Sequence, residues 1–314
     1  MLSFIVKRTL RSLLSLFLII CIVFILLRFM PIEGYFPVNY DRLSDLERNS
    51  ILKHMGLLDP IPVQLVKFFK QLAKFDFGES IRYRVAYPIA DIIKQKAPIS
   101  LQFGLTALII GIPLGWALGI MMARKKGGGW DKGGTFYIAL MNSIPAAVYI
   151  ILIQLYGADL LRAPLLFDPD KPITRLLPIF TLCLPIISSN AFWMRRFMVD
   201  ETNKDYIKLA YSKGVPHTEI FFKHVFRNAV VPMTNTLPGM ILFTIVGSIF
   251  VEGFYSIPGT GGLLIDVIRR QDNPMVQALV IIYSTLGIFG LLLGDLLMAF
   301  VDPRIKLHKK GDER

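Results

Sequence analysis

The chain alternates between long apolar runs and short polar segments, and the runs are long enough to cross a membrane. About 20 apolar residues span the hydrocarbon core of a bilayer as a helix. Such a span must be helical, because lipid offers no partners to free backbone N–H and C=O groups. The pattern therefore predicts an all-α, polytopic membrane protein with six transmembrane helices. The six runs lie at about 9–30, 99–122, 135–157, 175–194, 231–251 and 277–298.

The polar segments divide the chain into three parts. We expect a first transmembrane helix in 1–30, an extracytoplasmic loop or cap in 31–98, and a five-helix core in 99–314. The basic start and apolar stretch at the N-terminus could belong to a signal peptide, but no small-residue cleavage pattern follows, so we expect an uncleaved span. Within the cap, 42–57 and 62–75 have helical periodicity.

Basic residues in the short loops predict the orientation. They flank the first span, separate the second from the third, and follow the sixth, so the positive-inside rule places both termini in the cytoplasm. The loop entered through Arg195 and Arg196 then faces the cytoplasm too. The cations concerned are Lys7, Arg8, Arg11, Arg124, Lys125, Lys126, Lys132, Arg304, Lys306, Lys309 and Lys310.

Several predicted spans contain proline. A kink satisfied by neighbouring helices and a bend that shapes a translocation path are both open interpretations. The residues are Pro113, Pro145, Pro178 and Pro185. No internal repeat is evident, so an inverted-repeat secondary transporter gains no support.

Composition further limits the class of protein. The chain has 54% hydrophobic and 18% charged residues and a mean hydropathy of +0.53, which is too apolar for an ordinary soluble domain. Its net charge of +12 comes from cations at the ends of apolar runs, so membrane topology explains it better than nucleic acid. Cys21 and Cys183 both fall in apolar runs, where neither a disulfide framework nor a CxxC metal site is available.

The sequence offers little evidence of an enzyme. The four histidines, His54, His217, His224 and His308, lie in loops, and the chain contains no HExxH, GxSxG or GxxxxGK[ST] pattern. The segment PGTGG at 258–262 lacks the lysine and hydroxyl that would reach a phosphate and a metal. We therefore expect no catalytic, cofactor or metal site, and a tight re-entrant turn before a short helix at 263–269.

Ionisable residues at membrane depth mark ion or proton pathways when they have partners. Arg28 and Glu252 sit near span ends, where they could reach the interface. Asp295 has no obvious intramembrane partner, so a structural role is favoured over proton carriage.

A polar hairpin interrupts the apolar pattern at 206–232. In its first helix Ile207, Ala210, Tyr211 and Gly214 share one stripe by their i, i+3, i+4, i+7 spacing. Gly214 suits a turn with positive φ, and Pro216 suits the start of a new helix.

The second predicted helix of the hairpin has Phe221, Val225 and Ala229 on one face and His224, Arg227 and Asn228 near another. A helix resting on the lipid surface and a hairpin docked in a protein groove are both consistent with this spacing. The sharp break and the two apolar faces favour docking.

The segment KLAYSKGVPHTEIFFKHVFRNAVVP, 208–232, resembles the EAA loop of binding-protein-dependent ABC importer permeases. Gly214 matches the invariant glycine and Ala210 the second alanine, while Lys208 and Leu209 depart from the first two letters. This departure is typical of the dipeptide, oligopeptide and nickel branch, represented by the oligopeptide permease B-like inner membrane subunit. Matching segments cover nearly the whole chain: HMGLLDPIPVQ, FDFGESI, PIADIIKQKAPISLQFG, GIPLG, SIP, EGFYSIPGTGGLLIDVIRRQDNPMVQ and DLLMAFVDPRIK. MPIEGYFP at 30–37 departs from the PGDP of many members.

The resemblance implies a type I permease fold that pairs with a second permease, two cytoplasmic ATPases and an extracytoplasmic solute-binding protein in a bacterial or archaeal inner membrane. ATP and Mg would be used by the ATPases, with no cofactor on this chain. The coupling loop at about 195–231 would contact an ATPase, and the re-entrant element at about 252–276 would lie near the binding protein. The implied coupling residues are Ala210, Tyr211, Ser212, Lys213, Gly214, Pro216, His224 and Asn228, and those of the re-entrant element are Glu252, Pro258, Gly259 and Gly261.

Peptide is the expected substrate, with nickel or another small solute as the alternative. An ion-coupled carrier acting without ATPases and a membrane-embedded hydrolase are the competing classes. The hairpin argues against the carrier, and the lack of a nucleophile with a base in credible spacing argues against the hydrolase.

Overall fold

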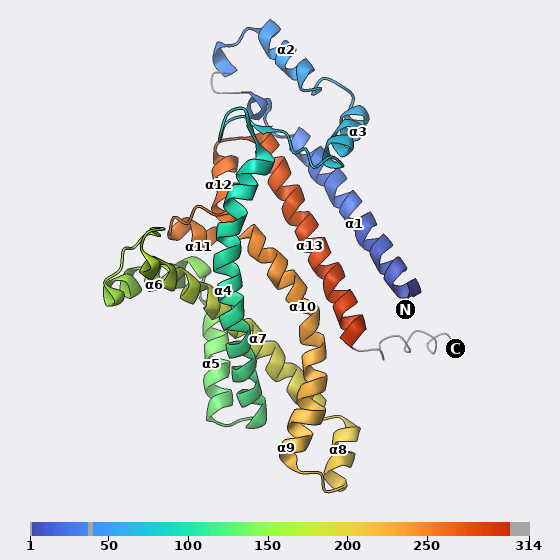
Figure 1. Ribbon diagram of the computed structural model, residues 1–314, viewed down its shortest axis with the longest axis vertical. Helices are drawn as coiled ribbons and strands as arrows, with labels where there is room; N and C mark the ends of the chain where they lie inside the picture. Colours follow the sequence, from blue (N-terminus) through green and yellow to red (C-terminus); the bar gives the residue numbers. More distant parts are fainter. Residues whose placement is uncertain (1, 37–39, 302–314) are drawn as a thin grey trace.

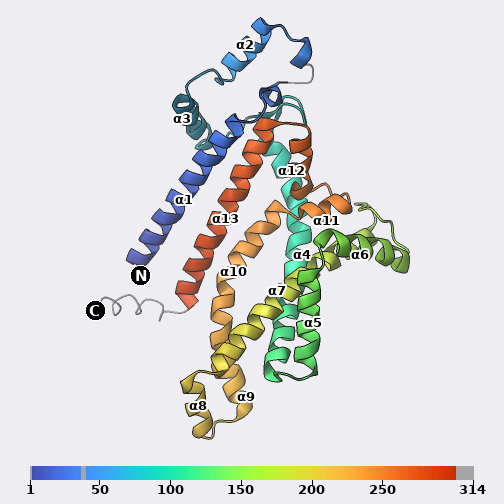
Figure 2. The ribbon, with the colours of Figure 1, turned by 180° about the vertical axis from the view of Figure 1, so that it is seen from behind.

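The computed structural model describes residues 2–36 and 40–301. The cations expected after the sixth span, Arg304, Lys306, Lys309 and Lys310, lie outside the described residues, as does His308. Figure 1 shows an elongated bundle with the helices of the N-terminal cap, residues 31–88, at one end and the polar hairpin, residues 205–226, at the other. The view from behind shows the same separation (Figure 2).

Five helical stretches of the described residues are long and apolar enough to cross a membrane, and a bent pair makes a sixth. The prediction of an all-α protein with about six spans is therefore confirmed. The five long helices are α1 (Leu2–Arg28), α4 (Ile89–Arg124), α7 (Leu176–Thr202), α10 (Arg227–Val246) and α13 (Asn273–Val301).

The expected third span is not one continuous helix. It consists of α5 (Gly129–Ser143) and α6 (Ala146–Leu161), which meet at an angle of 105°. Ile144 is extended and Pro145 precedes α6, as expected because a proline disfavours helical geometry in the residue before it. Pro113, Pro178 and Pro185 lie within helices, so only Pro145 accompanies a full break.

The core of the bundle is the crossing of α4 with α7 and of α10 with α13. Glycines allow the first crossing: a Cβ atom at Gly115 would lie 2.8 Å from the carbonyl oxygen of Ile187, and one at Gly119 would lie 2.7 Å from that of Ala191. Small residues four apart let helix backbones approach closely in a membrane. By contrast, α1 packs mainly on α13 and lies at the edge of the bundle (Figures 1 and 2).

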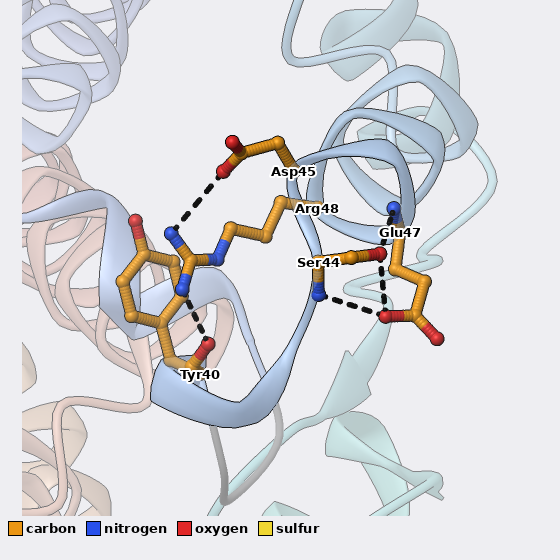
Figure 3. Close-up of polar contacts among 5 residues, drawn as sticks. All are labelled: Tyr40, Ser44, Asp45, Glu47 and Arg48. Atoms are coloured by element: carbon orange, nitrogen blue, oxygen red, sulfur yellow. Dashed lines mark hydrogen bonds and ion pairs between the residues drawn. The ribbon is translucent and has the colours of Figure 1, made fainter.

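The cap contains the two helices that periodicity predicts. They are α2 (Asp45–His54) and α3 (Ile61–Leu72), accompanied by two 3-10 turns, η1 (Ile32–Tyr35) and η2 (Tyr40–Arg42), and by a short antiparallel hairpin of β1 (Glu79–Ser80) and β2 (Tyr87–Pro88). Ser44 and Glu47 form a capping box at the start of α2, and Arg48 donates to the carbonyl of Tyr40 (Figure 3). The hydrogen bond from the Ser44 amide lowers the pKa of Glu47.

The remaining elements are short. A 3-10 turn, η3 (Pro172–Arg175), precedes α7. The hairpin contains α8 (Asp205–Ser212), α9 (His217–Glu219) and a π-helix, η4 (Ile220–Phe226). Between α10 and α13 lie α11 (Ile249–Phe254) and α12 (Thr260–Arg269), so the short helix expected at 263–269 begins three residues earlier. Both cysteines are free, and Cys183 is buried.

Candidate coupling hairpin and re-entrant segment

Two members of the predicted stripe on α8, Ile207 and Ala210, face the inside of the hairpin, whereas Tyr211 is 39% exposed and packs on the ring of His217. Ile207 is fully buried, and it packs in one cluster with Met194 and Met198 of α7 and with Ile220 and Val225. Ala210 is half-buried against the same cluster. The stripe therefore holds α8 to its own chain, and the opposite face remains for any partner.

The turn after α8 has the geometry that the sequence predicts. Gly214 has a φ of +76°, a conformation that a residue with a Cβ atom adopts only with strain. The amide of Val215 donates to the carbonyl of Ala210 at 3.2 Å, which satisfies a carbonyl at the helix end. A Cβ atom at Gly214 would meet nothing within 4 Å. Within this chain, then, the glycine serves the turn and not a close contact.

The second half of the hairpin differs from the expected separate short helix. Pro216 directly precedes α9, which continues through η4 into α10, so that 217–246 is helical without interruption. The expected apolar face is confirmed, since Val225 and Ala229 are 1% and 2% exposed. The hairpin is thus one short helix folded against the extended end of the fifth span.

Polar groups tie the two halves of the hairpin together. The side chain of Asn228 donates to the hydroxyl of Tyr206 at 2.7 Å and to the carbonyl of His224 at 2.8 Å. Tyr206 in turn donates to Glu201. His224 contributes its backbone here, so the predicted coupling residues His224 and Asn228 fix the shape of the hairpin.

The hairpin exposes large apolar side chains in a polar setting, of which Leu209 lies on the face of α8 opposite Ile207. Leu209 is 55% exposed, Phe222 is 49% exposed and Tyr211 is 39% exposed. Ser212 and Lys213 are exposed beside them. Lys208 pairs with Asp205 at 2.9 Å and lowers the pKa of that carboxyl. This surface combines apolar contact area with cations, as protein interfaces do.

Glu252 lies at the centre of the segment 248–262, which we call the re-entrant segment, and it is buried there. It is 3% exposed. Its carboxylate accepts hydrogen bonds from the amides of Gly261 at 2.7 Å, Gly262 at 3.3 Å and Ser248 at 3.2 Å. The carboxylate therefore joins the start of α11 to the first turn of α12, where helix amides favour negative charge.

The glycines of this segment leave room for that carboxylate. A Cβ atom at Gly259 would lie 2.3 Å from Oε2 of Glu252, and one at Gly261 would lie 2.7 Å from the backbone of Ser248. The carbonyl of Pro258 accepts a hydrogen bond from Lys96 at 3.4 Å. The four predicted re-entrant residues thus lie together, and their role in the fold is to close the segment on itself.

Two hollows adjoin the re-entrant segment. One of about 250 Å³ lies between α4, α7 and α10, with Phe103, Met240, Phe243 and Glu252 among its lining residues. The other, of about 580 Å³, lies between α11 and α12 and includes Lys96, Asp266 and Arg269. The segment therefore separates an apolar hollow inside the bundle from a charged one.

Sequence reasoning missed Asp272, which is fully buried. One carboxylate oxygen accepts from the hydroxyl of Ser80 at 2.6 Å and from the amides of Ile81, Arg82 and Tyr83 at 2.9–3.1 Å. The other accepts from the amide of Met275 at 3.2 Å, in the first turn of α13. The DNP sequence at 272–274 could have indicated a helix cap, but no local signal reveals the bond to residues almost 200 positions away.

Sequence reasoning also missed the partner of Asp295. Arg8 of α1 forms an ion pair with Asp295 of α13, with Arg8 Nε 2.5 Å from the carboxylate. The statement that Asp295 has no intramembrane partner is therefore wrong, whereas a structural role remains the interpretation that the pair favours. A similar pair joins Arg195 of α7 to the buried Asp131 of α5 at 2.5 Å.

Comparison with known proteins agrees with this architecture. Residues 111–307 match the family described as binding-protein-dependent transport system inner membrane component, and residues 1–82 match the N-terminal part of the same kind of protein. The dipeptide transport system permease protein DppB of Bacillus subtilis is 30% identical over 313 residues, covering 99% of this chain and 100% of the relative. DppB of Lactococcus lactis is 33% identical over 98% of this chain and 100% of the relative.

An oligopeptide permease, OppB of Salmonella typhimurium, is 28% identical over 98% of this chain and 100% of the relative. The similarity thus includes the first span, the cap, the hairpin and the re-entrant segment. The chain belongs to the family of binding-protein-dependent transport system inner membrane components, in its dipeptide and oligopeptide permease branch.

Proposed function

We propose that this chain is the permease subunit of an ATP-binding-cassette importer for peptides. It would form the translocation path with a second, similar permease and take substrate from a solute-binding protein outside the membrane. Two ATPase subunits would bind ATP and Mg and supply the energy, so this chain would hold no cofactor itself. Full-length similarity to peptide permeases supports the assignment.

The observation that carries the mechanism is the continuity of the helix at 217–246. It runs from the hairpin to Gly247, directly before the re-entrant segment that Glu252 closes. A continuous helix links the two ends directly, with Pro232 and Pro238 lying within α10. In the proposed orientation, with both termini in the cytoplasm, movement of the hairpin by an ATPase would reach the extracytoplasmic end of the path along α10.

The outer face of the hairpin is the proposed contact with the ATPase. Leu209, on the face of α8 opposite Ile207, would enter a groove, with Ser212 and Lys213 at its rim. The inner residues Ala210, His224 and Asn228, together with the turn at Gly214 and Pro216, would hold the shape that is recognised. The two states of the transporter must differ in such contacts, because a ligand shifts a conformational equilibrium only by its differential affinity for the two states.

A substitution on the outer face tests this proposal. In the reconstituted transporter, Leu209→Asp should abolish most binding-protein-stimulated ATP hydrolysis and peptide uptake, because it puts a charge into an apolar contact. The matched control is Leu46→Asp on α2, where the leucine is 84% exposed at the opposite end of the molecule. Normal stimulated hydrolysis and uptake by the correctly inserted Leu209→Asp variant would refute the proposed docking face.

The substrate class is tested on the cognate binding protein. Calorimetry with dipeptides, longer peptides and nickel complexes should show tight binding of peptides. Binding of nickel complexes alone would replace peptide with the metal as cargo and leave the permease assignment in place.

A further inference from the structure

A cavity of about 620 Å³ lies where the cap meets the bundle. Three helices bound it: Arg28 ends α1, Gln277 lies in the first turns of α13, and Gln64, Phe68 and Gln71 belong to α3. This cavity is separate from the hairpin, the re-entrant segment and both hollows beside it. Nothing in the proposed transport mechanism uses it.

The cavity contains polar groups that no other residue satisfies. Nε of Arg28 and Oε1 of Gln64 are buried and have no hydrogen-bond partner among the described residues, and Gln277, which is 7% exposed, lines the same cavity. Buried amides are normally paired, because leaving one unpaired costs about 1–3 kcal/mol. A ligand with hydrogen-bonding oxygens would supply the missing partner.

Arg28 places a half-buried cation in the wall of the cavity. Its guanidinium lies over the ring of Phe24 at 4.5 Å and donates to the hydroxyl of Tyr35 at 2.7 Å. Within residues 2–36 and 40–301 it has no carboxylate partner, although most buried cations in proteins have one. Lys53 also lines the cavity without a partner in that part of the chain, and Lys67 is paired with Asp59. Asp76 and Glu79 complete the charged lining.

The depth of Arg28 matches the layer of lipid phosphates. The apolar part of α1, Ile5–Arg28, contains 24 residues and is about 36 Å long at ~1.5 Å per residue. The hydrocarbon core is about 30 Å thick, or ~40–45 Å with its headgroups. Arg28 therefore lies in the headgroup layer on the cap side of the membrane.

Helix α3 forms a lipid-facing wall at the same level. Phe68 and Phe69 pack on Phe24 and Phe17 of α1, with ring centroids 5.2 and 5.3 Å apart. Because Phe17 lies 11 positions before Arg28, α3 is held beside the membrane-embedded part of α1, as Figure 1 shows. Val66 on α3 and Phe75 just after it are 55% and 79% exposed. Exposed apolar residues with lysines on one helix are typical of a helix at the lipid surface.

We propose that this cavity binds the phosphate-bearing headgroup of a phospholipid from the cap-side leaflet. Arg28 would bind the phosphate oxygens, Gln277 would bind the ester or glycerol oxygens, and the acyl chains would lie along α1 and α3. A guanidinium suits a phosphate because its N–H groups match two oxygens at once. The lipid would brace the cap against the first span.

The test uses the full chain in its purified, delipidated complex. Phosphatidylglycerol should raise the temperature of unfolding in a saturable manner. Diacylglycerol, which has the acyl chains without the phosphate, and inorganic phosphate, which has the anion without the chains, should not. An equal shift with diacylglycerol or with inorganic phosphate would overturn the assignment to a phospholipid headgroup.

Substitutions locate the site. Arg28→Gln should weaken phosphatidylglycerol binding about tenfold or more, since a hydrogen bond to a charged group is typically worth that much. Arg42→Gln, which changes an exposed arginine of η2, is the matched control and should not weaken it. If the Arg28→Gln variant fails to fold, the Gln277→Leu variant provides the test, because it removes a side-chain amide from the same cavity. Unchanged affinity in a folded Arg28→Gln or in Gln277→Leu would refute the proposal.

Discussion

The two ends of the molecule are held in different ways. At the cap end, the buried carboxylate of Asp272 binds donors of a distant segment and joins β1 and the residues after it to α13, while the buried Glu252 joins the neighbouring helices α11 and α12. At the hairpin end the ion pairs of α8, α9 and η4 are exposed and local, such as Lys208 with Asp205 and Lys223 with Glu219. The cap end is therefore fixed in shape, whereas the hairpin depends on its apolar cluster and leaves its outer surface free.

Arg82 is a second residue at the cap end that binds distant segments of the chain. It lies after β1 and reaches two other segments of the chain at the cap end. Its guanidinium donates to backbone or side-chain oxygens of Glu33, Phe36, Arg270 and Gln271. In the hairpin, Tyr206 links α8 to Glu201 of α7 and to Asn228 of α10, but the ion pairs that the structure describes within 205–226 join residues only three or four positions apart.

The largest effect is expected at Asp272. Asp272→Ala leaves five donors without an acceptor, two of them buried and three half-buried, and each orphaned donor that stays buried costs ~1–3 kcal/mol. The cap should detach from α13, which limited proteolysis in detergent would report as rapid cleavage between 30 and 90. Asp266→Ala is the control, since Asp266 lies nearby on α12 but is exposed. Equal protease resistance of the Asp272→Ala and Asp266→Ala variants would contradict the difference between the cap end and the hairpin end.

A smaller effect is expected at the pair of Arg8 and Asp295. Asp295→Asn removes the charge but keeps an oxygen, and both side chains are partly exposed, so the loss of stability should be about 1 kcal/mol. Peptide uptake should persist, as a structural role requires. Exchanging the two residues, Arg8→Asp with Asp295→Arg, should recover stability measured by thermal unfolding.

Arg11→Gln provides the control for this pair, because Arg11 is exposed and has no ion pair in the described part of the chain. Complete loss of uptake by a normally assembled Asp295→Asn variant would instead indicate a charge-dependent role. That result would show that a charged side chain within the span takes part in transport.

The smallest effect is expected on the hairpin. Lys223→Ala breaks an exposed i, i+4 pair with Glu219, which is worth only ~0.3–0.5 kcal/mol. The unfolding temperature should therefore stay within error of the wild type. A clear loss of stability, measured against Lys213→Ala, would show that exposed charges matter at this end as buried ones do at the other.

Much of the fold could be predicted because it depends on local periodicity. The six apolar runs, the cap helices and the positive φ of Gly214 all follow from residue types within one or two turns of helix. The bend at Pro145 could not be predicted, because Pro113 and Pro185 produce no comparable break within α4 and α7. Whether a proline bends or breaks a helix depends on what packs around it.

The candidate sites were predictable to a lesser degree. Spacing identified the stripe of Ile207 and Ala210 but not the direction in which it faces, since an apolar stripe suits an internal cluster and a partner equally well. Burial of Glu252 and pairing of Arg8 with Asp295 depend on contacts between distant segments. A single sequence carries no record of those contacts.

The π-helix η4 affects the direction in which the hairpin points relative to α10. A π-helical turn contains more residues than an α-helical turn, so such a stretch acts as an inserted residue within an otherwise regular helix. Each residue advances an α-helix by about 100° around its axis. The seven residues of η4 therefore set the angular phase between α9 and α10. Deleting one residue of η4 would therefore change the direction in which the hairpin points from the membrane helix, while the sequence of the rest of the hairpin stayed the same.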